Sequence, residues 1–353
     1  MTTAGAVTTT AGMAWLRGRW ARVLLLAAAG VAAAVALRGR VPDLAQILSI
    51  IGSADPRWLA AAVLAQVLSQ AAFARQQRTL LAALAVRVSR RDALAITYSR
   101  SAMSMVLPAG SAMSAAFALR EYRRHGASTA AATTGMVLSG AASVVGLTLL
   151  YAGAIGTSAF APHGGWRAAA LAGVAVLVVA LGGWAVVAYR RRAPLAAAAP
   201  RRMPSPGPGR IARGLFQARR VLREARAVRL RHWAVTISFA VLNWLLDLGC
   251  LVAVAHACEL PLSAFHLASV YLAVQVVRQI PLTPGGVGLI EASLLAGFVA
   301  AGAPQAGAAA VVLAYRIVSF WFLLPVGLVA YLRLNRDGRR QALAARNAPA
   351  PTM

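Results

Sequence analysis

The sequence has 353 residues, of which 59% are hydrophobic and 13% are charged. In a soluble domain roughly a quarter of the residues are charged, so this composition excludes a soluble globular protein. The net charge of +27 does not indicate nucleic acid binding, because the arginines lie between apolar runs rather than along a helix face with interleaved aromatic residues. Long uninterrupted apolar runs instead predict an all-α, polytopic transmembrane helical bundle.

Six apolar runs are long enough to cross ~30 Å of hydrocarbon. In chain order they are residues 20–37, 57–74, 127–155, 167–189, 233–256 and 306–333. The first run, with the arginines before it, also fits a cleaved signal peptide, but it is long for one, and we expect it to be retained as an anchor.

The arginines predict the orientation of these spans. They gather before the first span, after the second, before the third, after the last, and in residues 190–232, whereas the remaining connections carry almost none. By the positive-inside rule, both termini are cytoplasmic and the protein lies in the inner or plasma membrane.

The segment 190–232 holds 13 arginines against one acid, Glu224. Its Pro/Gly-rich part, 193–210, is too poor in periodic apolar residues to fold alone. Residues 211–231 fit either a basic amphipathic helix on the anionic inner leaflet or a solvated loop, and residues 75–92 have a similar character.

Two further apolar regions, 93–119 and 263–300, are interrupted by Pro and small residues. Proline cannot continue a helix and glycine permits a sharp turn, so each region predicts two short helices. Each helix is short for a full span, which favours a re-entrant hairpin covered by protein or a watery cavity. Crossing twice is the alternative, since both arrangements keep the predicted sides consistent.

The two broken regions indicate an inverted repeat. Pro108 precedes Gly126 by 18 residues, and Pro284 precedes Gly302 by the same number, 176 residues later. Each half contains an odd number of crossings, so the halves have opposite orientations. The predicted parts are a cytoplasmic tail (1–19), the first repeat (20–155), the fourth span (156–189), a basic linker (190–232), the rest of the second repeat (233–334) and a cytoplasmic tail (335–353).

Inverted halves with discontinuous helices that meet near the midplane are a transporter design. The half-helix N-termini expose free N–H groups that suit a phosphate, although a purely structural kink is the alternative. Charges inside the membrane are costly and indicate function. We expect substrate contacts from Arg100, Ser104, Pro108, Gly110, Ser111, Arg278, Gln279, Pro284, Gly285, Gly286, Glu291 and Arg316.

Three residues of the last two spans, Asn243, Asp247 and Tyr315, are expected to balance charge. Two acids against three arginines predict ion pairs, with Arg316 facing Glu291 or Asp247, and a surplus positive charge that favours an anionic headgroup. No motif of a soluble enzyme is present, the histidines are scattered, and the two cysteines fit apolar helix positions. We therefore expect no enzyme activity, cofactor or metal.

The stretch RQIPLTPGGVGLIEASLLAGFVAAG, followed by AYRIVSFWFLLPVGLVAYL, resembles the flippase-like transmembrane family, which is the membrane half of lysylphosphatidylglycerol synthase and its stand-alone relatives. Pro281, residues 284–288, Glu291 and Arg316 carry the resemblance, and MVLPAGSAMSAAFALREYRRHG is similar to actinobacterial members. The resemblance implies a domain that moves an anionic or aminoacylated phospholipid between leaflets. The chain ends about twenty residues after its last span, so we expect no aminoacyl-transfer domain.

Three functions therefore follow from the sequence. The first is a lipid translocase for a phospholipid or polyprenyl-linked lipid, with membrane lipids as partners. The second is a secondary transporter for a small solute or ion. The third is a scaffold for a lipid or cell-envelope biosynthetic enzyme, and membrane-embedded catalysis ranks behind it.

Overall fold

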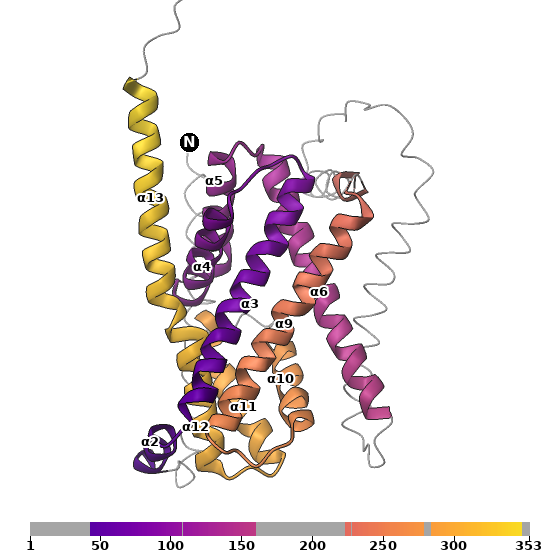
Figure 1. The fold of residues 1–353 in the computed structure, drawn as a ribbon, viewed down its shortest axis with the longest axis vertical. Helices are drawn as coiled ribbons and strands as arrows, with labels where there is room; N and C mark the ends of the chain where they lie inside the picture. The colour runs from indigo at the N-terminus through magenta and orange to yellow at the C-terminus, as the bar shows by residue number, and fades with distance from the viewer. Residues whose placement is uncertain (1–42, 108, 160–222, 227, 279–283, 348–353) are drawn as a thin grey trace, which may run out of the picture. The chain divides into compact units, whose positions relative to one another are not determined.

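A computed structural model describes residues 43–107, 109–159, 223–226, 228–278 and 284–347, and all regular structure in these ranges is helical (Figure 1). Contacts divide the chain into two units, Met1–Leu48 and Ser49–Met353. In the first unit, the Asp43 carboxylate accepts a hydrogen bond from the N–H of Ala45 (3.0 Å) at the start of α2 (Leu44–Gly52). This helix is not among the predicted elements, because it is too short to cross a membrane.

The second unit contains four helices that are long and apolar enough to cross a membrane. They are α3 (Pro56–Ala83), α6 (Thr129–Ala159), α9 (Leu230–Ala257) and the continuous run of α12 (Gln305–Arg316), the π-helix η3 (Ile317–Trp321) and α13 (Leu323–Asn347). These helices confirm four of the six predicted spans, and the predicted spans 20–37 and 167–189 lie outside the described residues.

The helix α3 is longer than the predicted span 57–74. It begins at Pro56, where proline has no N–H to leave unpaired, and the Asp55 carboxylate accepts the N–H of Arg57 (2.8 Å). Near its other end, the Gln76 amide donates to the Ser139 carbonyl on α6 (2.8 Å), so α6 stabilises polar residues that follow the apolar run. The predicted surface segment 75–92 is therefore divided between α3 and the next helix.

The two Pro/Gly-broken regions form helical hairpins. The first pairs α4 (Arg90–Val106) with α5 (Gly110–Arg124), and the second pairs α10 (Ala264–Arg278) with α11 (Leu289–Ala300) through the short helix η2 (Pro284–Gly286). The longest of the four helices has 17 residues, about 26 Å, and is shorter than the ~30 Å of the hydrocarbon core. Their lengths fit hairpins that turn within the membrane.

The tips of the two hairpins touch each other. Gly285 has φ +62°, and a Cβ atom there would lie 2.7 Å from both the Met105 carbonyl oxygen and a ring carbon of Phe320. At the other tip, a Cβ on Gly110 would lie 2.6 Å from the Ser104 carbonyl oxygen. Only glycine permits these backbone approaches, which explains its presence at both breaks.

The central helices α3 and α9 are antiparallel and lie side by side (Figure 1). The N–H of Asp55, before α3, donates to the carbonyl of Ala257 at the end of α9 (3.0 Å). Halfway along, the Ser69 hydroxyl donates to the Asn243 side chain (3.0 Å). The starts of α3 and α9 are 174 residues apart, and so are Ser69 and Asn243, so these two residues hold the same position in their helices. This offset is two residues shorter than the 176 between Pro108 and Pro284. The inverted repeat stays a prediction that this contact supports.

The hairpins are held by apolar packing. The second hairpin is buried in a cluster that includes Val254, Leu267, Leu294 and Phe298, and the Tyr151 hydroxyl of α6 donates to a carbonyl of α10 (2.6 Å). The first hairpin packs on α3, α6 and α13. The tips are thereby positioned by surrounding helices rather than by their own short connections.

Candidate functional site

A cavity of about 760 Å³ lies where the two hairpin tips meet α3, α9 and the π-helix η3. Nine predicted site residues line it: Ser104, Gly110, Ser111, Asn243, Asp247, Arg278, Gly285, Gly286 and Arg316. These residues come from distant parts of the sequence, so the tertiary structure brings both broken regions and both central helices to one place.

Asp247 anchors a buried polar cluster at the cavity wall. Its carboxylate accepts hydrogen bonds from the hydroxyls of Tyr271 (2.8 Å) and Tyr315 (3.2 Å), and the Arg278 guanidinium lies 3.6 Å away. Two hydroxyls satisfy most of the carboxylate, and Arg278 also donates to the Gln275 amide oxygen (3.4 Å). A guanidinium has five N–H donors, so Arg278 retains donors for a ligand in the cavity.

Arg316 is fixed more tightly than Arg278. Its side chain is 4% exposed and pairs with the Glu291 carboxylate at 2.5 Å, while Glu291 also accepts the N–H of Gly288 (2.7 Å) at the start of α11. The guanidinium lies 4.4 Å from the centre of the Phe320 ring and 3.4 Å from the Gly285 carbonyl. The sequence left open which acid Arg316 faces, and the structure shows that it is Glu291.

Arg100 does not join the other predicted arginines. It donates to the Gln77 amide oxygen (2.8 Å), which also accepts the Tyr122 hydroxyl, and it is not among the residues that line the cavity. The charges of Arg278 and Arg316 are matched by Asp247 and Glu291. The expected surplus of positive charge from a third arginine is therefore absent from this cluster of described residues.

Pro108 and Gln279 lie outside the described residues. Pro284 belongs to η2. Glu291 and Tyr315 do not line the cavity but contact residues that do: Glu291 pairs with Arg316, and Tyr315 donates to Asp247.

Several polar residues of the cavity are missing from the sequence-based prediction. Gln66, Ser69 and Gln70 line it from one face of α3, and Ser319 lines it from η3. Gln66 and Ser319 are only 3% and 4% exposed, and within the described ranges the Gln66 side-chain oxygen and the Ser319 hydroxyl have no hydrogen-bond partner. The three α3 residues could have been predicted from the sequence, because they are polar and share one helix face inside the predicted span 57–74.

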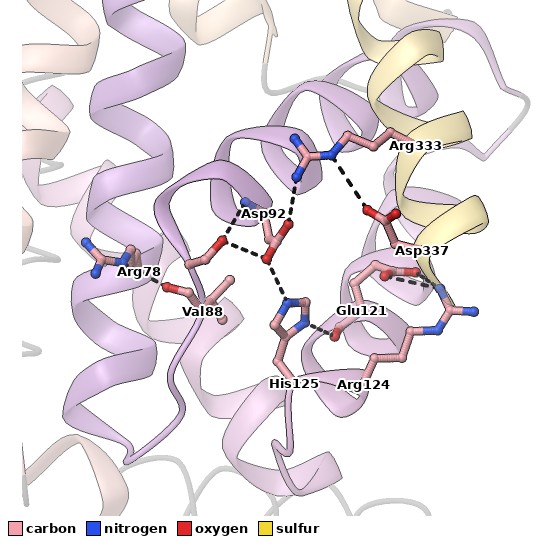
Figure 2. A network of polar contacts seen from close by, with 9 residues as sticks. Arg78, Val88, Asp92, Glu121, Arg124, His125, Arg333 and Asp337 are labelled. Atoms are coloured by element: carbon pink, nitrogen blue, oxygen red, sulfur yellow. Dashed lines mark hydrogen bonds and ion pairs between the residues drawn. The ribbon is translucent and has the colours of Figure 1, made fainter. Parts of the chain in front are cut away.

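A second polar network ties the open end of the first hairpin to α13 (Figure 2). The Asp92 carboxylate of α4 faces the His125 ring (3.4 Å) and the Arg333 guanidinium of α13 (3.3 Å), and Arg333 also faces Asp337 (3.7 Å). These side chains are partly exposed and satisfy one another. The network thus links α4, the end of α5 and α13.

Among the residues that the structure describes, no three His, Cys, Asp or Glu side chains gather where they would hold a metal ion. Cys250 and Cys258 are buried free thiols.

Comparison with known proteins gives a family and a distant relative. The family model described as the lysylphosphatidylglycerol synthase TM region matches residues 9–327. A UPF0104 membrane protein from Methanothermobacter thermautotrophicus is 26% identical over 98 residues, which cover 28% of this chain and 28% of that protein. The match thus spans little more than a quarter of that relative. With a family match over most of the sequence and four helices able to cross a membrane, this multi-pass membrane protein belongs to the family of the lysylphosphatidylglycerol synthase TM region.

Proposed function

We propose that this protein is a lipid translocase whose cavity takes a polar headgroup while the acyl chains stay in the bilayer. The observation that carries the proposal is the depth of the cavity. Ser69 and Asn243 line it from the midpoints of α3 and α9, so a membrane crossed by these helices places it near the midplane. Polar groups at this depth are costly, and the headgroup of a lipid in transit needs them there.

The free donors suit a phosphate. Arg278 has N–H groups that Asp247 does not use, and a charge-assisted hydrogen bond to phosphate is among the strongest in proteins. The helix α5 begins at Gly110 beside the cavity, and Ala109 before it provides no side-chain cap. The unpartnered oxygens of Gln66 and Ser319 supply acceptors for hydroxyl or amine groups of the same headgroup.

An acid and an arginine side by side suit a headgroup that carries both phosphate and amine. The name of the family model refers to lysylphosphatidylglycerol, a lipid with both groups. At ~30 Å³ for each water, a cavity of about 760 Å³ holds roughly 25 waters, enough room for such a headgroup with part of its hydration. The proposal includes no covalent step, and acyl chains remain outside the cavity.

The proposed orientation places the basic ends of α3, α5 and α13 in the cytoplasm of a cell with this protein in its inner or plasma membrane. The hairpin α4–α5 then opens toward the cytoplasm and the hairpin α10–α11 toward the other side. A shift of either tip would open the cavity to one leaflet at a time, which is the alternating access of inverted-repeat transporters.

The test is leaflet exchange of fluorescent phosphatidylglycerol in proteoliposomes, read by dithionite quenching. Arg278→Gln should slow exchange about tenfold or more, because the lost bond to phosphate contributes roughly 1.5–3 kcal/mol. Arg336→Gln is the matched control, since this arginine is exposed on α13, and it should stay within about twofold. Wild-type exchange no faster than in empty liposomes, across phosphatidylglycerol, its lysyl ester and a polyprenyl phosphate, would contradict the proposal.

A second candidate is a transporter of a small uncharged solute such as a polyol or sugar. The favouring observation is that hydroxyl and amide side chains outnumber charged ones at the cavity wall; they are Gln66, Ser69, Gln70, Ser101, Ser104, Ser111, Ser143, Asn243 and Ser319. Uptake of radiolabelled polyols into the same proteoliposomes separates the candidates. Solute uptake without lipid exchange supports this second function, whereas neither activity favours a scaffold for a biosynthetic enzyme.

A further inference from the structure

A second hollow, of about 660 Å³, is lined by α4, α5 and α13 on the side of the first hairpin. We call it the hairpin groove. Its walls are apolar and include Val106, Met113 and Leu328, which are each more than half exposed. Its inner Ser99 hydroxyl is already bonded to the Ala95 carbonyl (2.7 Å). The groove thus presents an extended apolar surface on which an apolar ligand can pack without forming hydrogen bonds.

One end of the hairpin groove is cationic. Arg120 lines it, lies 5.3 Å from the Phe117 ring centre, and is 47% exposed. Its guanidinium faces the Glu121 carboxylate (3.1 Å), but Glu121 also pairs with Arg124 (2.9 Å; Figure 2). Arg120 also donates to the Asn335 amide oxygen (3.2 Å). Two arginines share one acid, and these two contacts use two of the five N–H donors of the guanidinium, so Arg120 keeps donors and charge for an anion at this end.

The other end of the groove lies at Leu107, beside the polar cavity. Leu107, at the tip of the first hairpin, lines both hollows. From Met113 to Arg120 the groove follows about 10 Å of α5, and Leu107 extends it further. This is comparable to the ~15 Å depth of one leaflet.

We infer that the hairpin groove holds a phospholipid of the leaflet at the basic end, with its phosphate at Arg120 and an acyl chain along the groove toward Leu107. A cationic end, an apolar wall comparable to one leaflet's depth and a wall residue shared with the cavity, Leu107, all match this lipid. The inference rests on the proposed function in one respect. It makes the groove the site from which the lipid headgroup enters the cavity, past Leu107, during translocation.

The test uses the full chain in liposomes that contain phosphatidylglycerol with a diazirine near the end of one acyl chain. After illumination, labelled residues are located by peptide mass spectrometry. Labelling should concentrate around Val106–Met113 and on α13 beside them. Ala116→Trp fills the groove and should lower this labelling about fivefold, whereas Ala141→Trp, at an exposed alanine on α6, should change it less than about twofold.

A second variant tests the cationic end. Wild type should label more with phosphatidylglycerol than with phosphatidylcholine carrying the same diazirine, and Arg120→Gln should bring the ratio close to one. Even labelling of all exposed helix faces, unaffected by Ala116→Trp, would overturn the lipid site. Normal leaflet exchange in Ala116→Trp would overturn the groove as the access route and leave the proposed function intact. Concentrated labelling in a wild type that exchanges no lipid would sustain the lipid site and overturn the proposed function.

Discussion

At the scale of single residues, Asp247 shows how a charge is kept inside the bundle. Its partners come from two helices, α10 and α12, so removing it leaves two hydroxyls and Arg278 without their partner. Asp247→Ala should destabilise the protein by about 3–5 kcal/mol, as expected for a broken buried ion pair. Tyr315→Phe removes one hydrogen bond and should cost only about 1 kcal/mol. Thermal unfolding in detergent measures both, and equal midpoints for the two variants would show that Asp247 holds no such cluster.

A substitution of Gln66 tests whether this residue has a functional or a structural role. Its side-chain oxygen is buried without a partner, so Gln66→Leu removes an unmet polar group and should leave stability unchanged or raise it by about 1 kcal/mol. The same change should slow leaflet exchange, because the cavity loses an acceptor for the headgroup. The thermal unfolding midpoint and the leaflet-exchange rate of this variant, measured side by side, distinguish the two roles. A drop in stability together with activity would assign Gln66 to packing.

At the scale of elements, the contact between the hairpin tips depends on Gly285. Gly285→Ala adds a Cβ 2.7 Å from the Met105 carbonyl and from Phe320, so the tips must separate and exchange should be lost. Gly126→Ala is the matched control, since Gly126 also has a positive φ (+83°) but nothing lies within 4 Å of its added Cβ. It should cost about 1 kcal/mol of backbone strain and keep exchange. Equal exchange in the two variants would mean that tip contact is dispensable.

At the scale of the whole molecule, the orientation is open to a direct measurement. In a background with Cys250→Ala and Cys258→Ala, single cysteines replace exposed Glu259, just after α9, and exposed Arg339, on α13. The positive-inside rule predicts that an impermeant maleimide reaches Arg339→Cys only from the cytoplasm and Glu259→Cys only from outside. Labelling of both from one side would refute the predicted topology.

The long spans and the breaks were predictable because they depend on local chemistry. Apolar runs such as 233–256 become helices wherever lipid provides no hydrogen bonds, and Pro with Gly ends a helix in any context. Some helices are longer than the predicted spans, as α3 is, because Gln76 donates a hydrogen bond to Ser139 on α6. The sequence likewise marked Arg278, Arg316 and Asp247 as functional, since charges within an apolar run are costly.

The sequence by itself thus determined the class of protein, the described spans, the two hairpins and the charged residues of the cavity, Asp247, Arg278 and Arg316. Only the tertiary structure decided the partners: Arg316 with Glu291, Arg278 beside Asp247, and Arg100 away from both. Helix formation depends on residues a few positions apart, whereas pairing depends on how separate helices are packed, and the paired residues are 25 positions apart for Arg316 and Glu291 and 31 for Arg278 and Asp247. The predicted surplus of charge failed for that reason, because counting charges along a chain does not show which of them share one cavity.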